Sequence, residues 1–137
     1  MTGAPGAAAV RNERGANKVL TVTAVLEGAT GLGVLAQPSV VFSLILGSSL
    51  DSGAAFVVAR IAGVALLALG LACWSARHDD ARAVRGLVGA MALYNVGVLA
   101  ILAHASLVWG LSGIALWPVV VGHAVMGSWC TITARHS

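Results

Sequence analysis

Long apolar runs alternate with short polar segments along this chain. The longest run without Lys, Arg, Asp or Glu covers residues 86–134, which is 49 positions. A helix needs about 20 apolar residues to cross a bilayer, so this run is long enough for two crossings joined by a tight turn. We place the turn in Ser106–Gly113, which contains two helix-breaking glycines. The run therefore predicts spans over about residues 86–105 and 113–134.

The first half of the chain predicts two further spans. After Lys18, the only charged residue up to position 37 is Glu27, and the only one in residues 53–76 is Arg60. Both segments are long enough to cross a bilayer as helices. The pattern therefore predicts four transmembrane helices in all.

Two segments do not fit a crossing. Residues 1–17 are rich in Gly and Ala, and we expect a short disordered cytoplasmic arm there. Pro38–Leu50 is apolar but too short to span; Pro38 suits a first helical turn and Gly47 a C-terminal cap. We expect a short interfacial helix on the outer surface, with a re-entrant segment as the alternative. The expected fold is all-α, a four-helix transmembrane bundle over residues 18–137 with this interfacial helix between its first two spans.

Composition agrees with a membrane location. The chain is 58% hydrophobic and 9% charged, whereas soluble domains carry about 25% charged residues. Too few polar residues are present to cover a water-soluble particle. The net charge of +3 does not indicate nucleic-acid binding, because the basic residues lie at the predicted span ends and form no patch.

The basic residues also predict an orientation. Three of them precede or begin the first span, three lie in Arg77–Arg85, and Arg135 ends the last span. The two loops on the opposite side contain no Lys or Arg, only Asp51. Because basic loops stay on the cytoplasmic side, we expect a multi-pass protein of a bacterial inner membrane with both termini in the cytoplasm.

Each predicted span carries a strongly polar residue in its middle third. These residues are Glu27, Arg60, Asn95 and His123, and Tyr94 precedes Asn95. A charge at the bilayer centre costs at least about 2.5–3.5 kcal/mol, so we expect these groups to converge inside the bundle, with Glu27 paired to Arg60. Two interpretations stay open: a structural pair that sets helix order, or a site for a ligand, an ion or a proton.

The cysteines and histidines give a weaker indication of metal binding. Cys73 and Cys130 lie near the cytoplasmic ends of their spans, and His78 and His136 follow them. Thiol and imidazole can bind a soft metal, but this spacing matches no metal motif, and a free buried Cys is ordinary. The chain also has no phosphate-binding loop, paired metal-binding histidines or nucleophile elbow. We therefore assign no catalytic residue, cofactor or metal ligand.

Several short motifs follow one another over roughly residues 19–134. They are Glu27-Gly28-Ala29-Thr30-Gly31-Leu32, Pro38, Gly47, Ala59-Arg60-Ile61-Ala62-Gly63, Leu69-Gly70-Leu71-Ala72-Cys73-Trp74, Tyr94-Asn95, Trp117-Pro118 and His123-Ala124. In this order they resemble a group of small four-helix bacterial membrane proteins of uncharacterised function. The resemblance implies an inner-membrane bundle and supplies no activity, substrate or catalytic residue.

Three functional classes stay open. The leading expectation is an integral membrane protein without enzymatic chemistry, either an accessory subunit of a larger membrane complex or a self-associating bundle, since the short loops leave no aqueous domain. The second is a small homo-oligomeric transporter or proton-coupled carrier that uses the polar residues of the midplane. The third is a membrane-embedded enzyme acting on a lipid, a quinone or a metal. The expected partners are membrane lipids, another membrane protein or a second copy of the chain.

Overall fold

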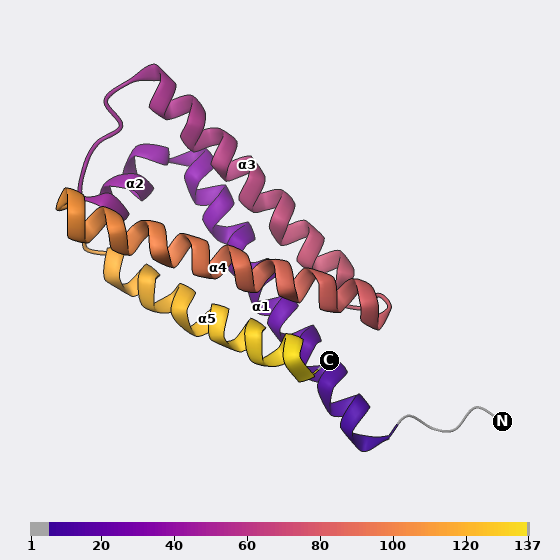
Figure 1. The fold of residues 1–137 in the computed structure, drawn as a ribbon. Helices are drawn as coiled ribbons and strands as arrows, with labels where there is room; N and C mark the ends of the chain where they lie inside the picture. The colour runs from indigo at the N-terminus through magenta and orange to yellow at the C-terminus, as the bar shows by residue number, and fades with distance from the viewer. Residues whose placement is uncertain (1–5, 137) are drawn as a thin grey trace.

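The computed structural model describes residues 6–136, with side chains from Arg14 to Arg135, and this part of the chain is entirely helical (Figure 1). Four of its helices contain a segment long and apolar enough to cross a membrane. The predicted all-helical fold with four candidate spans is therefore confirmed. The five helices are α1 (Ala7–Ala36), α2 (Pro38–Leu46), α3 (Gly53–Ala76), α4 (Ala81–Trp109) and α5 (Leu116–His136).

Several helix boundaries differ from the predicted ones, among them the start of α1 and both ends of α4. Residues 7–17, expected as part of a disordered arm, form the first turns of α1. Alanine is the strongest helix former, and Ala16 is packed in the core, so both propensity and burial favour the helix there. At its start, α4 is capped by Asp80, whose carboxylate accepts hydrogen bonds from the backbone N–H groups of Arg82 and Ala83 at 2.9 and 3.0 Å. It ends at Gly110, whose φ of 68° suits a glycine.

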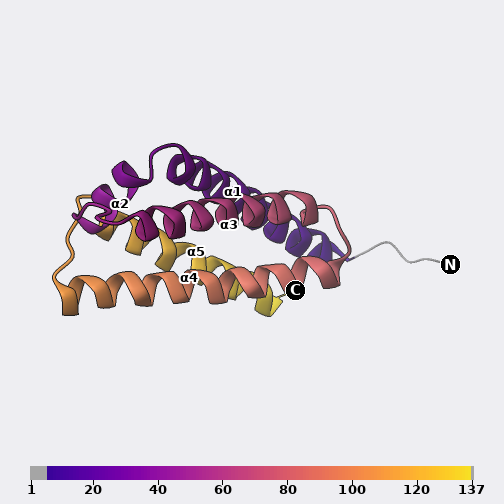
Figure 2. The same cartoon turned by 90° about the horizontal axis from the view of Figure 1, so that it is seen from above.

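The helices are arranged as two pairs. α1 packs along α3, and α4 packs along α5, while α3 has little contact with α4. Figures 1 and 2 show that α3 and α4 meet near the loop that joins them and separate toward the other end, where α2 lies. The packed core lies at the end where α3 and α4 meet. Its largest buried side chains are Val19, Leu20, Cys73, Val88, Met91 and Cys130.

α1 and α3 approach each other backbone to backbone. A Cβ atom added at Gly31 would lie 2.8 Å from the carbonyl oxygen of Gly63, and one added at Gly70 would lie 3.0 Å from that of Ala24. Only glycine allows this approach. Lipid tails are as apolar as the helices, so association depends on such close van der Waals contact and not on the hydrophobic effect.

The short helix α2 is attached to the bundle by backbone hydrogen bonds. The N–H groups of Ser112, Gly113 and Ala115, in the α4–α5 loop, donate to the carbonyls of Leu46, Ile45 and Leu44 at 3.2, 3.2 and 2.8 Å. The last carbonyls of a helix have no partner within the helix itself, so the loop completes the C-terminus of α2. The predicted helix after Pro38 is present, and its loop contacts hold it against the ends of α4 and α5.

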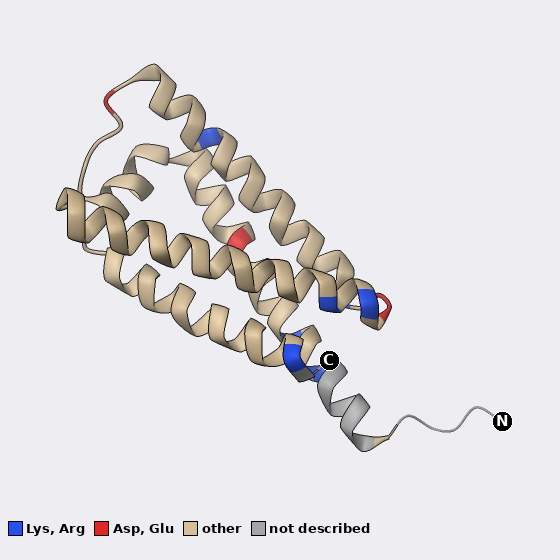
Figure 3. Ribbon diagram, in the orientation of Figure 1, with Lys and Arg blue, Asp and Glu red and all other residues tan. Residues whose placement is uncertain are grey.

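The charged residues are distributed unevenly over the bundle. Apart from Arg60, the described basic residues lie toward the end that holds the α3–α4 loop and the C-terminus (Figure 3). The opposite end carries Asp51, in the loop between α2 and α3. Between the two ends, the described helices carry no Lys, Arg, Asp or Glu other than Glu27 and Arg60, as a lipid environment favours.

The glycine contact between α1 and α3 predicts contrasting effects for two substitutions on one helix. We expect Gly31→Ala to lower the free energy of unfolding by about 1–3 kcal/mol, because its new methyl group overlaps the backbone of Gly63 and Leu67. A Cβ at Gly28 meets nothing within 4 Å, so Gly28→Ala should leave stability unchanged or raise it by up to about 1 kcal/mol. The stability of both variants can be measured by monitoring the loss of helix content as they unfold in mixed micelles. Equal stabilities would contradict the close contact.

Candidate functional site

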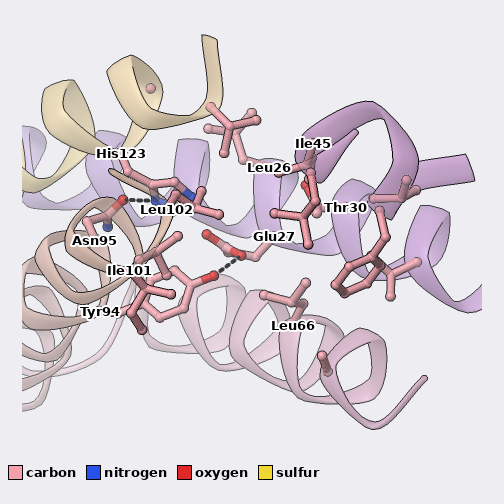
Figure 4. A pocket seen from close by; sticks show the side chains of 18 of the residues that line it. Leu26, Glu27, Thr30, Ile45, Leu66, Tyr94, Asn95, Ile101, Leu102 and His123 are labelled. Atoms are coloured by element: carbon pink, nitrogen blue, oxygen red, sulfur yellow. Dashed lines mark hydrogen bonds between the residues drawn. The ribbon is translucent and has the colours of Figure 1, made fainter. Parts of the chain in front are cut away.

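A chamber of about 500 Å³ lies between the two helix pairs. Apolar side chains from all five helices form most of its wall, among them Phe42, Ile45, Leu66, Ile101, Leu102 and Val119. α3 contributes only Ala62 and Leu66. The polar lining residues come from α1, α4 and α5, and Figure 4 shows how most of them lie: Thr23, Glu27, Thr30, Tyr94, Asn95 and His123.

Glu27 reaches the chamber from the middle of α1. Its side chain is 7% exposed, and the Tyr94 hydroxyl on α4 donates a hydrogen bond of 3.1 Å to its Oε2 atom. Figure 4 shows the second carboxyl oxygen directed away from Tyr94, on the side of Leu102. One oxygen of the carboxyl group is thus bound within the protein, and the other faces the chamber.

A second hydrogen bond joins α4 to α5. Asn95 is 2% exposed, and its Nδ2 donates to the carbonyl oxygen of Met91 at 2.8 Å. Its Oδ1 therefore faces Nδ1 of His123, also at 2.8 Å. Since Oδ1 can only accept, Nδ1 of His123 carries the proton, and Nε2 of the neutral imidazole is an acceptor.

The two hydrogen-bonded pairs touch each other. The rings of Tyr94 and His123 meet edge to face, with centroids 5.8 Å apart and planes at 75°. Glu27, Tyr94, Asn95 and His123 therefore form one group, which we call the polar cluster. The prediction that polar residues from different spans converge is correct for these four of the five residues.

Arg60 does not join the polar cluster. Its side chain is exposed on α3, and among the described residues it forms no ion pair with Glu27. It lies about 200° around the α3 axis from Ala62, one of the two α3 residues that line the chamber, and so points away from the chamber. The expected Glu27–Arg60 pair is thus absent. The long side chain of Arg60 can instead extend along α3 toward the membrane surface.

Thr23 belongs to the site although sequence reasoning did not select it. Its side chain is 2% exposed, lines the chamber, and its hydroxyl oxygen has no hydrogen-bond partner among the described residues. Thr23 precedes Glu27 by four residues, so the two lie on the same face of α1. The four-residue spacing from Glu27 could have identified Thr23 from the sequence. The lack of a described hydrogen-bond partner for its hydroxyl depends on the packing of the helices.

The cysteines lie in the packed core and not in the chamber. Cys73 and Cys130 are fully buried, and the thiol of Cys73 lies 3.5 Å from the sulfur of Met91. His78 is exposed and accepts a hydrogen bond from Arg77, and the His136 side chain lies outside the described residues. Within the described part of the chain, no three His, Cys, Asp or Glu residues gather as metal ligands would.

Comparisons with protein-family models, with curated proteins and with solved structures found no match to this chain. The site therefore has to be interpreted from its own residues.

The Glu27–Tyr94 hydrogen bond can be tested directly, because Tyr94 is the only tyrosine in the chain. In protein labelled with 13C-tyrosine, the single ring Cζ resonance should move when Glu27→Gln weakens the bond, since the phenol then donates to a neutral amide oxygen. Thr30→Val, which changes another chamber residue of α1, should leave it in place. An unmoved resonance in the Glu27 variant would contradict the contact.

Proposed function

We propose that this protein is a multi-pass inner-membrane protein that binds an amphiphilic, membrane-soluble molecule in the chamber. Four apolar helices are compatible with an integral membrane protein. The observation that carries the proposal is the composition of the chamber wall, which is apolar except for the polar cluster and two threonines. Sites for small molecules are typically about 300–1,000 Å³, mainly apolar, with a few polar groups that orient the ligand.

The position of the chamber supports uptake from the bilayer. The ribbons of α3 and α4 diverge beside it, and α3 supplies only two small or apolar side chains to its wall (Figure 2). We infer that a ligand enters sideways between these helices, with its polar group directed to Glu27 and its apolar body toward α2. The tightly packed core at the basic end closes the chamber on that side.

This closed end favours binding over passage through the bundle. A carrier or proton-coupled transporter would need a second conformation in which Val19, Leu20 and Met91 separate. The roles of accessory subunit and self-associating bundle stay predictions. Exposed apolar residues such as Leu93 and Leu107 suit contact with lipid and with another protein equally well.

We further propose that both termini are cytoplasmic and that the membrane is a bacterial inner membrane. The support is the gathering of basic residues at the end of the bundle that holds the α3–α4 loop. In this orientation α2 and the α4–α5 loop lie on the outer side, and the chamber occupies the outer half of the membrane.

Filling the chamber should remove ligand binding. A side chain at Gly122 would project into open space, and Gly122 lines the chamber; Gly97 has the same free space but does not line it. We expect Gly122→Phe to reduce the small molecule that copurifies from membranes by about tenfold, equivalent to about 1.4 kcal/mol, and Gly97→Phe to leave it unchanged. Solvent extraction followed by mass spectrometry measures this. Equal amounts in all samples, or none in the unmodified protein, would count against the proposal.

Labelling of single added cysteines tests the orientation. Ser49 and Asp79 are exposed in loops at opposite ends of the bundle, whereas the native thiols are buried. We expect Ser49→Cys to react with a membrane-impermeant maleimide in intact cells, and Asp79→Cys to react only after the membrane is opened. The unmodified chain serves as the control for Cys73 and Cys130. The reverse pattern would refute cytoplasmic termini.

A further inference from the structure

Among the described residues, the carboxyl group of Glu27 has no positive partner. Arg60 points away from the chamber, and Lys18 lies about 14 Å along α1 toward the basic end. Arg85 is separated from Tyr94 by a similar length of α4. The groups that face Glu27 from the other elements are the hydroxyl of Tyr94 and the imidazole of His123, which already donates its Nδ1 proton to Asn95.

A lone carboxylate in a membrane interior is unfavourable. Transfer of an unpaired charge into an apolar medium costs at least several kcal/mol, so the carboxyl group must hold a proton or a cation. No described side chain supplies the cation, yet the chamber beside the free oxygen has room for a bound molecule. A positively charged group on that molecule would satisfy the carboxylate.

The other free polar atoms of the site are mainly acceptors. Both polar atoms of Asn95 are used within the protein, and the hydroxyl proton of Tyr94 is donated to Glu27. The polar groups left beside the chamber are one Glu27 oxygen and the lone pair at Nε2 of His123, whereas the Thr23 hydroxyl oxygen is enclosed by the protein. Both groups beside the chamber accept hydrogen bonds. A neutral carbonyl group, as in a quinone, would therefore find few donors, whereas an N–H-bearing cation would find two acceptors.

Aromatic side chains add a further attraction for a cation. Phe42, Tyr94 and Trp109 line the chamber. The face of an aromatic ring attracts a nearby positive charge, and the attraction is larger where water is excluded. The chamber thus combines an anion, hydrogen-bond acceptors and ring surfaces with an apolar wall.

From this combination we propose that the chamber is selective for protonated lipophilic amines. The ammonium group pairs with Glu27 and donates to His123, and the hydrocarbon body lies against the wall formed by α2, α4 and α5. The proposal rests on the proposed function, because it requires the chamber to bind an amphiphile. It adds the chemical class of the ligand and the residue that selects it.

The test compares two ligands of equal length that differ in charge. Full-length protein in phosphatidylcholine nanodiscs is equilibrated at neutral pH with radiolabelled decylamine or decanol, and empty nanodiscs correct for partition into lipid. We expect decylamine to bind at least about tenfold more tightly than decanol. Glu27→Gln, which is nearly isosteric, should reduce decylamine binding to the level of decanol. Thr21→Val, on α1 outside the chamber, is the matched control and should keep the preference.

Each outcome has a distinct meaning. If both ligands bind the unmodified protein equally, the amine selectivity is refuted and the chamber remains an amphiphile site. If neither binds above empty nanodiscs, the proposed function fails as well.

Protection of Glu27 from a hydrophobic carbodiimide provides a test without any substitution. The modified carboxyl group is located by peptide mass spectrometry. Decylamine should protect the carboxyl group and decanol should not; equal protection would overturn the proposal.

Discussion

The backbone contact between α1 and α3 fixes the spacing of these two helices. Gly31 and Gly63 lie where the backbones are closest, and a Cβ atom added at Gly31 would be 2.8 Å from the carbonyl oxygen of Gly63. Glu27 lies one turn before Gly31 on the same side of α1, and its carboxyl group reaches Tyr94 on α4. Arg60, three residues before Gly63 on α3, is exposed. Of the two intramembrane charges, only Glu27 is therefore enclosed.

The chamber results from unequal packing in the two halves of the bundle. At the basic end, Leu20, Cys73, Met91 and Cys130 fill the space between the helix pairs. At the other end the pairs diverge, and α2 with the α4–α5 loop covers the gap. The hydrogen bonds from this loop satisfy the carbonyls at the end of α2, so the short helix has a defined position. One half of the bundle is tightly packed, and the other encloses the chamber.

In the polar cluster, hydrogen bonds within the protein use the donors and leave mainly acceptors toward the chamber. Asn95 uses both of its polar atoms inside the protein and thereby sets the tautomer of His123. Tyr94 uses its only proton on Glu27. Because these donors are used, the cluster faces the chamber with acceptors and one carboxyl oxygen. This connects the proposed binding of amphiphiles with the preference for amines: the wall accepts a hydrocarbon body, and the cluster selects its head group.

Hydropathy and length were sufficient to determine the four candidate spans of the chain, and the cost of polar groups in lipid was sufficient to predict that Glu27, Tyr94, Asn95 and His123 meet. That cost depends on the depth of a group in the membrane, which the sequence indicates, and not on the direction in which its side chain leaves the helix. The tertiary structure alone decided that Arg60 faces outward, that the Thr23 hydroxyl has no partner among the described residues and that α2 lines a chamber. These features depend on the rotation and spacing of packed helices, which no single segment encodes.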